Sequence, residues 1–116
     1  MRLKFSDLFE GIGTAELCYS QEICCALSGQ EVELAGWLSL AHPGGGRVML
    51  VSEPGVCPDC SPIPVACLDL PGFNAPRGPT AVRLRGRLSY GFQCDAEGTA
   101  SFLRLEEAKI ATGILA

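Results

Sequence analysis

Two glycines, Gly36 and Gly86, each stand in the middle of a stretch whose alternation predicts a β-strand. From Gln30 to Leu40 apolar residues recur at every second position, and Ala81 to Phe92 repeats the pattern. Each glycine falls on the apolar side between leucines, where a flat sheet would carry a larger side chain. Mid-strand glycines mark bulges or sharp bends. The two glycines therefore predict strands that bend strongly, as in a small sheet that curls on itself.

Alternation of apolar and polar residues predicts five strands along the chain. Two are short apolar runs on either side of a connection rich in proline and cysteine. The predicted strands are Gln30–Leu40, Arg47–Ser52, Pro64–Leu70, Ala81–Phe92 and Ser101–Ala108. The side chains expected to face the core are Val32, Leu34, Leu38, Leu40, Val82, Leu84, Leu88, Tyr90, Phe92, Leu103 and Leu105. Those expected to face outward are Glu31, Glu33, Trp37, Ser39, Arg83, Arg85, Arg87, Ser89, Phe102, Arg104 and Glu106.

Helical spacing marks the first part of the chain. Within residues 1–13 the apolar side chains predict one amphipathic turn or an arm packed on the sheet; they are Phe5, Leu8, Phe9 and Ile12. A helix is predicted from Leu17 to Ser28, and Gly29 suits the position that stops it. Its apolar face is expected to consist of Tyr19, Ile23, Ala26 and Leu27.

Five strands with two sharp bends predict a mainly β protein, a five-stranded OB-like barrel preceded by an N-terminal helix. A two-sheet sandwich normally needs about seven strands. With 116 residues the chain is expected to form a single OB-like domain, in which residues 1–29 are an arm and helix and residues 30–110 the barrel. The segment from 71 to 79 leaves no room for the helix that an OB barrel usually has there, so the N-terminal helix is expected to plug the barrel instead.

Three stretches resemble a group of small bacterial proteins of unknown function that have an OB-like barrel, some of them periplasmic or lipoproteins. The stretches are YSQEICCALSGQEVELAGWL, VMLVSEPGVCPDCSPIPVACLDL, and VRLRGRLSYG with SFLRLEEAKI. They resemble, in order, that group's helix and first strand, its second and third strands with a proline-rich loop, and its closing hairpin. The resemblance spans Tyr19 to Ala111 and implies a fold without an established activity. Cys57 and Cys60 stand where that group's loop varies.

Cys57 and Cys60 form the most site-like motif, Cys-Pro-Asp-Cys, because this spacing lets two thiolates reach one tetrahedral ion. Zinc would need further ligands, and Cys67 is the nearest candidate, with His42 and Cys94 as others. His42 is expected about 20 Å away, at the far end of the second strand. The alternatives are a disulfide and two cysteines that only tighten the connection. An oxidoreductase is disfavoured because no helix follows to lower a thiol pKa.

A basic row on the strand from Ala81 to Phe92, together with Trp37, gives the candidate ligand-binding residues: Trp37, Arg83, Arg85 and Arg87. OB barrels bind single-stranded nucleic acid through basic grooves and exposed aromatics. The closing hairpin is expected to place Arg85 opposite Glu106 and Arg87 near Arg104, which would partly neutralise the row. Together with the chain's net charge of −4, this makes nucleic-acid binding a disfavoured alternative.

Composition and charge narrow the function classes further. The chain has one histidine, in a glycine-rich stretch, and no catalytic constellation can be drawn, so a non-enzymatic binding or assembly module is expected. Open strand edges favour a homodimer, and another protein partner stays open. No apolar run is long enough to span a bilayer, and the first residues lack a secretory pattern. A cytoplasmic location is therefore expected, although a leader removed from this sequence would change that.

Overall fold

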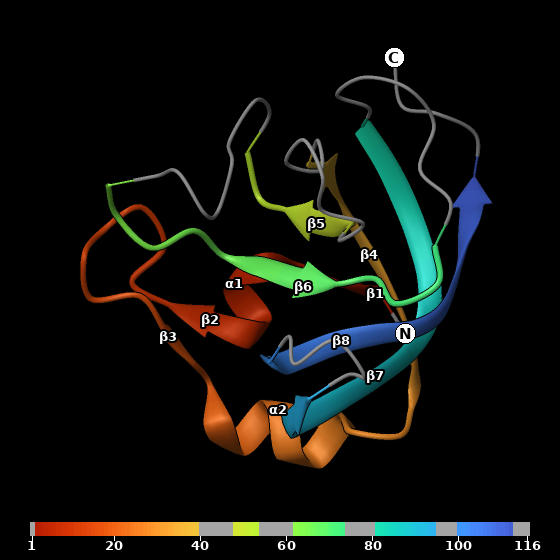
Figure 1. Ribbon diagram of the computed structural model, residues 1–116, viewed down its shortest axis with the longest axis horizontal. Coiled ribbons are helices and arrows are strands. Elements are labelled where there is room, and N and C mark those ends of the chain that lie inside the picture. The colour runs from red at the N-terminus through yellow and green to blue at the C-terminus, as the bar shows by residue number, and fades with distance from the viewer. Residues whose placement is uncertain (1, 40–47, 54–61, 74–80, 95–99, 113–116) are drawn as a thin grey trace.

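The computed structural model describes residues 2–39, 48–53, 62–73, 81–94 and 100–112, and all structural statements concern these residues. It is mainly β, as predicted, with two short helices in its N-terminal part (Figure 1). The elements are β1 (Arg2–Leu3), α1 (Phe5–Leu8), β2 (Phe9–Glu10), β3 (Cys18–Tyr19), α2 (Gln21–Leu27), β4 (Glu31–Leu38), β5 (Met49–Val51), β6 (Cys67–Asp69), β7 (Ala81–Cys94) and β8 (Ala100–Thr112).

The five predicted strands correspond to β4 through β8, and their pairings form a closed circuit. Starting from β4, the pairings pass through β5, β6, β8 and β7 and return to β4. All of them are antiparallel except β6 with β8, which is parallel and joins Asp69 to Arg104. A second, two-stranded sheet consists of β2 and β3, which the sequence did not reveal.

The bend predicted at Gly36 lies where β4 changes partners. One edge of β4 pairs with β7 over its length, while the other edge pairs with β1 at Glu33 and Leu34 and with β5 at Trp37 and Leu38. Gly36 falls between these two partners. A Cβ atom at Gly36 would lie 2.7 Å from the carbonyl oxygen of Val51. The absence of a side chain therefore allows the backbones of β4 and β5 to approach.

Gly86 has the same role on the strand opposite. It pairs with Val32 of β4, and a Cβ atom there would lie 2.7 Å from the carbonyl oxygen of Glu106 on β8. The register between β7 and β8 shifts beside Gly86, where Glu107 takes a φ of 55°, a left-handed conformation unusual for a non-glycine residue. The bend is thus built from a glycine on one strand and a bulge on its neighbour.

The core is filled from the strands and from the first helix. Val32, Leu34, Leu38, Val82, Leu84, Leu88, Leu103 and Leu105 are buried, as predicted. Phe5 and Leu8 of α1 join them, and Phe5 contacts the site of Gly36. The N-terminal arm therefore supplies the interior, as its spacing predicted. Leu40 lies outside the described residues.

The predicted helix is shorter than expected and turned about its axis. α2 spans Gln21–Leu27, Tyr19 belongs to β3, and Ile23 is 40% exposed. Its buried side chain is Cys24, whose Sγ lies 3.7 Å from the carbonyl oxygen of Leu8. Of the predicted apolar face, Leu27 packs against the core, whereas Ile23 and Ala26 are exposed, because α2 packs on α1 through the thiol of Cys24. Gly29 has the left-handed φ of 89° that a helix stop requires.

Two outward assignments were also wrong: Ser39 and Arg104 are buried. The backbone N–H of Ser39 donates to the carbonyl oxygen of Met49, the first residue of β5. No helix among the described residues is long and apolar enough to cross a membrane.

Replacement of Gly86 or Gly36 by alanine is expected to destabilise the fold by about 2–4 kcal/mol, because the new Cβ atom meets a carbonyl oxygen that cannot move alone. Urea melts measure the loss. The control is Ala35→Val, a half-buried neighbour opposite Arg83, which is expected to change stability by less than about 0.5 kcal/mol. Glycine variants as stable as the parent would refute the close approach.

Candidate functional site

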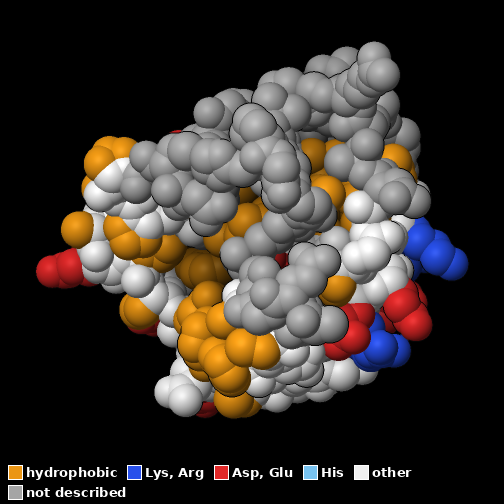
Figure 2. Space-filling model, in the orientation of Figure 1, with side chains coloured by type: hydrophobic (Ala, Val, Ile, Leu, Met, Phe, Trp, Pro, Cys, Tyr) orange, Lys and Arg blue, Asp and Glu red, His pale blue; other side chains and the backbone are white. Residues whose placement is uncertain are grey.

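Four aromatic side chains gather where the end of β7 and the start of β8 lie near β3. We call them the aromatic cluster, and they are Tyr19, Tyr90, Phe92 and Phe102. Tyr19 touches both Tyr90 and Phe102, with ring centroids 6.0 and 6.4 Å apart, and Phe92 lies 5.4 Å from Phe102. Phe92 is 63% exposed and Phe102 48%. Apolar side chains accordingly gather over the end of β7 and the start of β8 in the space-filling view (Figure 2).

The cluster continues into the protein interior. Tyr19 packs on Phe9 with ring centroids 5.2 Å apart, and Phe9 stacks on Phe5 at 6.1 Å. Phe9 and Phe5 belong to the core. The exposed rings therefore connect through Tyr19 to buried aromatic side chains, and this packing holds them in position.

A bulge at Gly91 turns Phe92 outward. Phe92 was expected to face the core, since it follows Leu88 and Tyr90 at even spacing. Between Tyr90 and Gln93 the register with β8 shifts, and Gly91 has a φ of 126° that side chains rarely adopt. The extra residue reverses the alternation beyond it. The outward orientation predicted for Phe102, in contrast, is confirmed.

The buried side chain of Arg104 stabilises this bulge. Its side chain was expected to point into solvent, yet the residue is only 4% exposed. Nη1 donates to the carbonyl oxygens of Gly91 and Ser101, at 2.9 and 3.1 Å, and to the Ser101 hydroxyl, while Nη2 donates to the Ser89 hydroxyl at 2.9 Å. Because these acceptors lie on both strands, the guanidinium joins β7 to β8 at the point where their ladder is interrupted.

Tyr19 links the cluster to β6. Burial raises the pKa of the Tyr19 hydroxyl, and the charges of Cys67 and Asp69 raise it further. Cys67 and Asp69 lie on the side of β6 opposite the buried Leu68. Asp69 is also in register with Arg104. The Tyr19 hydroxyl therefore lies near enough to Cys67 and Asp69 of β6 for their charges to act on its pKa.

Two of the three arginines of the predicted basic row, Arg85 and Arg87, are paired with carboxylates, though in another register than expected. Arg85 pairs with Glu33, Nε to Oε1 at 3.1 Å, and lies 3.9 Å from Glu31. Arg87 lies 3.6 Å from Glu106 and 3.6 Å from Glu107. The expected register was wrong, because β7 and β8 pair Arg87 with Glu106, Arg85 with Lys109 and Ser89 with Arg104.

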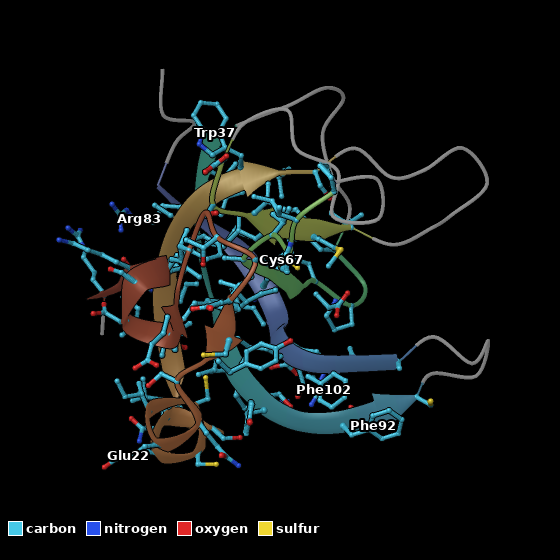
Figure 3. All side chains as sticks on the ribbon, turned by 90° about the vertical axis from the view of Figure 1, so that its left-hand side faces the viewer. Glu22, Trp37, Cys67, Arg83, Phe92 and Phe102 are labelled. Carbon is cyan, nitrogen blue, oxygen red and sulfur yellow. The ribbon has the colours of Figure 1, made fainter. Side chains whose placement is uncertain are left out.

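The four candidate ligand residues do not form one site. A groove of about 730 Å³ has charged walls that include Arg85, Arg87, Lys109, Glu31 and Glu107. Trp37 and Arg83 are not part of it. Trp37 is half-buried and lies at the opposite end of the molecule from Phe92 (Figure 3). Its lining also includes Ile110 and Ala111, so the groove is mixed in character rather than predominantly apolar, as small-molecule sites usually are.

The predicted metal ligands can be followed only in part. Cys57, Cys60 and His42 lie outside the described residues. Cys67 is half-buried on β6, and Cys94 is exposed at the end of β7. Among the described residues no group of three or more His, Cys, Asp or Glu side chains is arranged to hold a metal ion. Zinc at Cys57, Cys60 and Cys67 stays a prediction.

The aromatic cluster was missed because its members lie far apart in the sequence. Tyr19 was assigned to a helix, Tyr90 and Phe92 to the core, and Phe102 to the outer surface without neighbours. The one available signal was Gly91, since a glycine inside a strand indicates a bulge that can reverse the alternation.

Comparison with known proteins gives no relative: no protein-family model matches this chain, and no curated protein matches it.

Replacement of Arg104 by methionine is expected to destabilise the protein by about 3 kcal/mol, because the carbonyl oxygens of Gly91 and Ser101 lose a donor in a buried place. Denaturant melts measure the loss. Arg87→Met is the matched control, because this exposed pair is expected to contribute less than about 1 kcal/mol. Equal effects of the two replacements would contradict the bracing role of Arg104.

Glu33→Gln is expected to remove a stabilising contribution that depends on pH. The hydrogen bond from Arg85 holds the Glu33 pKa below its ordinary value, so the folded protein takes up this proton less readily than the unfolded chain. The contribution is present above the ordinary glutamate pKa, about 4.3, and disappears as the pH falls from there through the folded pKa. Urea melts should show the gap between parent and variant closing on acidification; a constant gap would refute it.

Proposed function

We propose that this chain is an OB-like barrel that acts as a non-enzymatic binding or assembly module, with the aromatic cluster as its contact surface. The barrel is supported by the closed circuit of β4, β5, β6, β8 and β7. Further support comes from the parallel pairing of β6 with β8, and from the bends at Gly36 and Gly86. The resemblance of the sequence to small OB-like proteins agrees with this arrangement.

The exposure of the aromatic cluster carries the proposal. Exposed large aromatics in contact with one another are unusual on a monomer's surface, and contact surfaces are enriched in such side chains. Tyr and Phe also lose little side-chain entropy on binding, because each has two rotatable angles. Here the packing of Tyr19 on Phe9, and of Phe9 on Phe5, reduces this entropy cost further. Such a surface suits an uncharged, apolar partner surface on a protein.

Single-stranded nucleic acid is a second candidate, because exposed aromatics can stack on bases. Such binding also needs cations to follow the phosphates. Arg85 and Arg87 are paired with carboxylates, and Arg104 is buried. These pairings favour a protein partner over nucleic acid.

Photo-crosslinking from the cluster tests the proposal. The photoreactive amino acid benzoylphenylalanine in place of Phe92 is expected to give protein adducts in the cells that produce the chain. The same replacement of Ile110, which is 46% exposed at the other end of β8, is expected to give few. Adducts that disappear on nuclease treatment would favour nucleic acid. Equal adducts from both positions, or none, would refute the aromatic cluster as the contact surface.

A further inference from the structure

Three exposed rings of the aromatic cluster follow one another in a row, which we call the ring row: Tyr19, Phe102 and Phe92. The ring centroids of Tyr19 and Phe102 are 6.4 Å apart, and those of Phe102 and Phe92 are 5.4 Å apart. Figure 3 shows Phe102 and Phe92 near each other at the end of the β7–β8 hairpin. The length of the row is therefore comparable with one turn of a polyproline II helix, about 9 Å.

Neighbouring rings of the aromatic cluster meet at steep angles. The planes of Phe92 and Phe102 enclose 61°, and those of Tyr19 and Tyr90 enclose 71°. The ring faces therefore point in different directions, so the surface that they form is ridged rather than flat. Proline-rich segments bind surfaces lined by aromatic side chains, on which their rigid pyrrolidine rings can pack.

Two phenol hydroxyls, those of Tyr19 and Tyr90, accompany the row. Burial raises the pKa of Tyr19, and the charges of Cys67 and Asp69 raise it further, so this hydroxyl keeps its proton at neutral pH. Neither hydroxyl donates a hydrogen bond to another residue that the structure describes. A polyproline II helix has no internal hydrogen bonds, so its carbonyl oxygens are open to donors. The two phenols can supply such donors.

We infer that the ring row binds a proline-rich segment of another protein in the polyproline II conformation. The proline rings would pack on Tyr19, Phe102 and Phe92, while the phenols donate to carbonyl oxygens of the segment. This inference rests on the proposed function, because it names the kind of protein segment that occupies the aromatic cluster.

The geometry of the hairpin disfavours other ways of binding a segment. A strand added to β7 would need an uninterrupted edge, but the bulge at Gly91 shifts the register, and the backbone N–H of Tyr90 already donates to the Ser28 hydroxyl. An amphipathic helix needs a longer apolar groove than three rings provide. A polyproline II segment is extended before it binds, so it loses little conformational entropy and needs less apolar contact. We therefore expect dissociation constants on the order of tens of micromolar.

Charge indicates which residues should flank the prolines. The charge of Asp69 acts on Tyr19, and the chain as a whole has a net charge of −4. The sequence that joins β7 to β8 contains Asp95 and Glu97 and no Lys or Arg. Arg104, the basic residue that follows it on β8, is buried. Lys or Arg beside the prolines would therefore be attracted to this surface, whereas Asp or Glu would be repelled.

A peptide array provides the first test. The full chain is applied to peptides that carry prolines at every third position, flanked by Lys, by Glu or by uncharged residues. Peptides flanked by Lys are expected to bind most strongly. Replacement of their prolines by glycine is expected to weaken binding at least about tenfold, because glycine does not hold the segment extended. Fluorescence anisotropy with the labelled peptides measures the dissociation constants.

Variants of the chain test whether the ring row is the site. Phe92→Ser combined with Phe102→Ser is expected to raise the dissociation constant at least about tenfold. Tyr19→Phe keeps the ring and removes only the hydroxyl, so an increase of about threefold to tenfold is expected. The control, Ile110→Ser, removes a comparably exposed apolar side chain elsewhere on β8 and is expected to leave binding unchanged. Unchanged thermal melts establish that each variant is folded.

The outcomes separate this inference from the proposed function. If no peptide binds while Phe92 crosslinks to another protein, the proline-rich occupant is overturned and the binding module stands. Binding that survives the loss of the prolines, or of both Phe92 and Phe102, also overturns the inference. A chain that binds no peptide and whose Phe92 gives no adducts overturns both.

Discussion

The contact between backbones at Gly36 and Gly86 is the constraint on which the rest of the structure depends. At both positions a carbonyl oxygen of the neighbouring strand occupies the space of a side chain. This lets β4 pair with β7 on one edge while its other edge passes from β1 to β5. Without that bend the five strands could not return to their starting partner. The bend also brings α1 under the sheet, so the N-terminal residues become part of the core.

The surface features follow from the same geometry. β7 and β8 are longer than the circuit needs, so the end of β7 and the start of β8 extend past the last pairing with β4. The bulge at Gly91 would leave carbonyl groups without donors, and the Arg104 guanidinium supplies them. Burying a cation is costly, but a planar guanidinium can reach acceptors on two strands at once. The exposure of Phe92 is thus a consequence of backbone geometry that a buried arginine stabilises.

Much of the fold could be predicted from the sequence, because alternation and mid-strand glycines report local geometry. The strands around Val32 and Leu84, the bends and the packing of Phe5 all follow from spacing of two or about four residues. The aromatic cluster could not be predicted, since Tyr19 and Phe102 meet only through the fold. The register of β7 with β8 was also out of reach, because three irregularities shift it and each depends on both strands. One such shift decides whether Arg85 or Arg87 meets Glu106.

The order of the pairings has a consequence for how this chain is made. β4 finds its longest partner in β7, about fifty residues later in the chain, as the pairing of Glu33 with Arg85 illustrates. A ribosome therefore releases β4, β5 and β6 before the strands that complete their circuit exist. Distant pairings of this kind slow folding, and unpaired apolar strands are prone to aggregate while they wait. The acidic residues of the first half, which has no Lys or Arg from Phe5 to Gly46, would keep such nascent segments apart from one another.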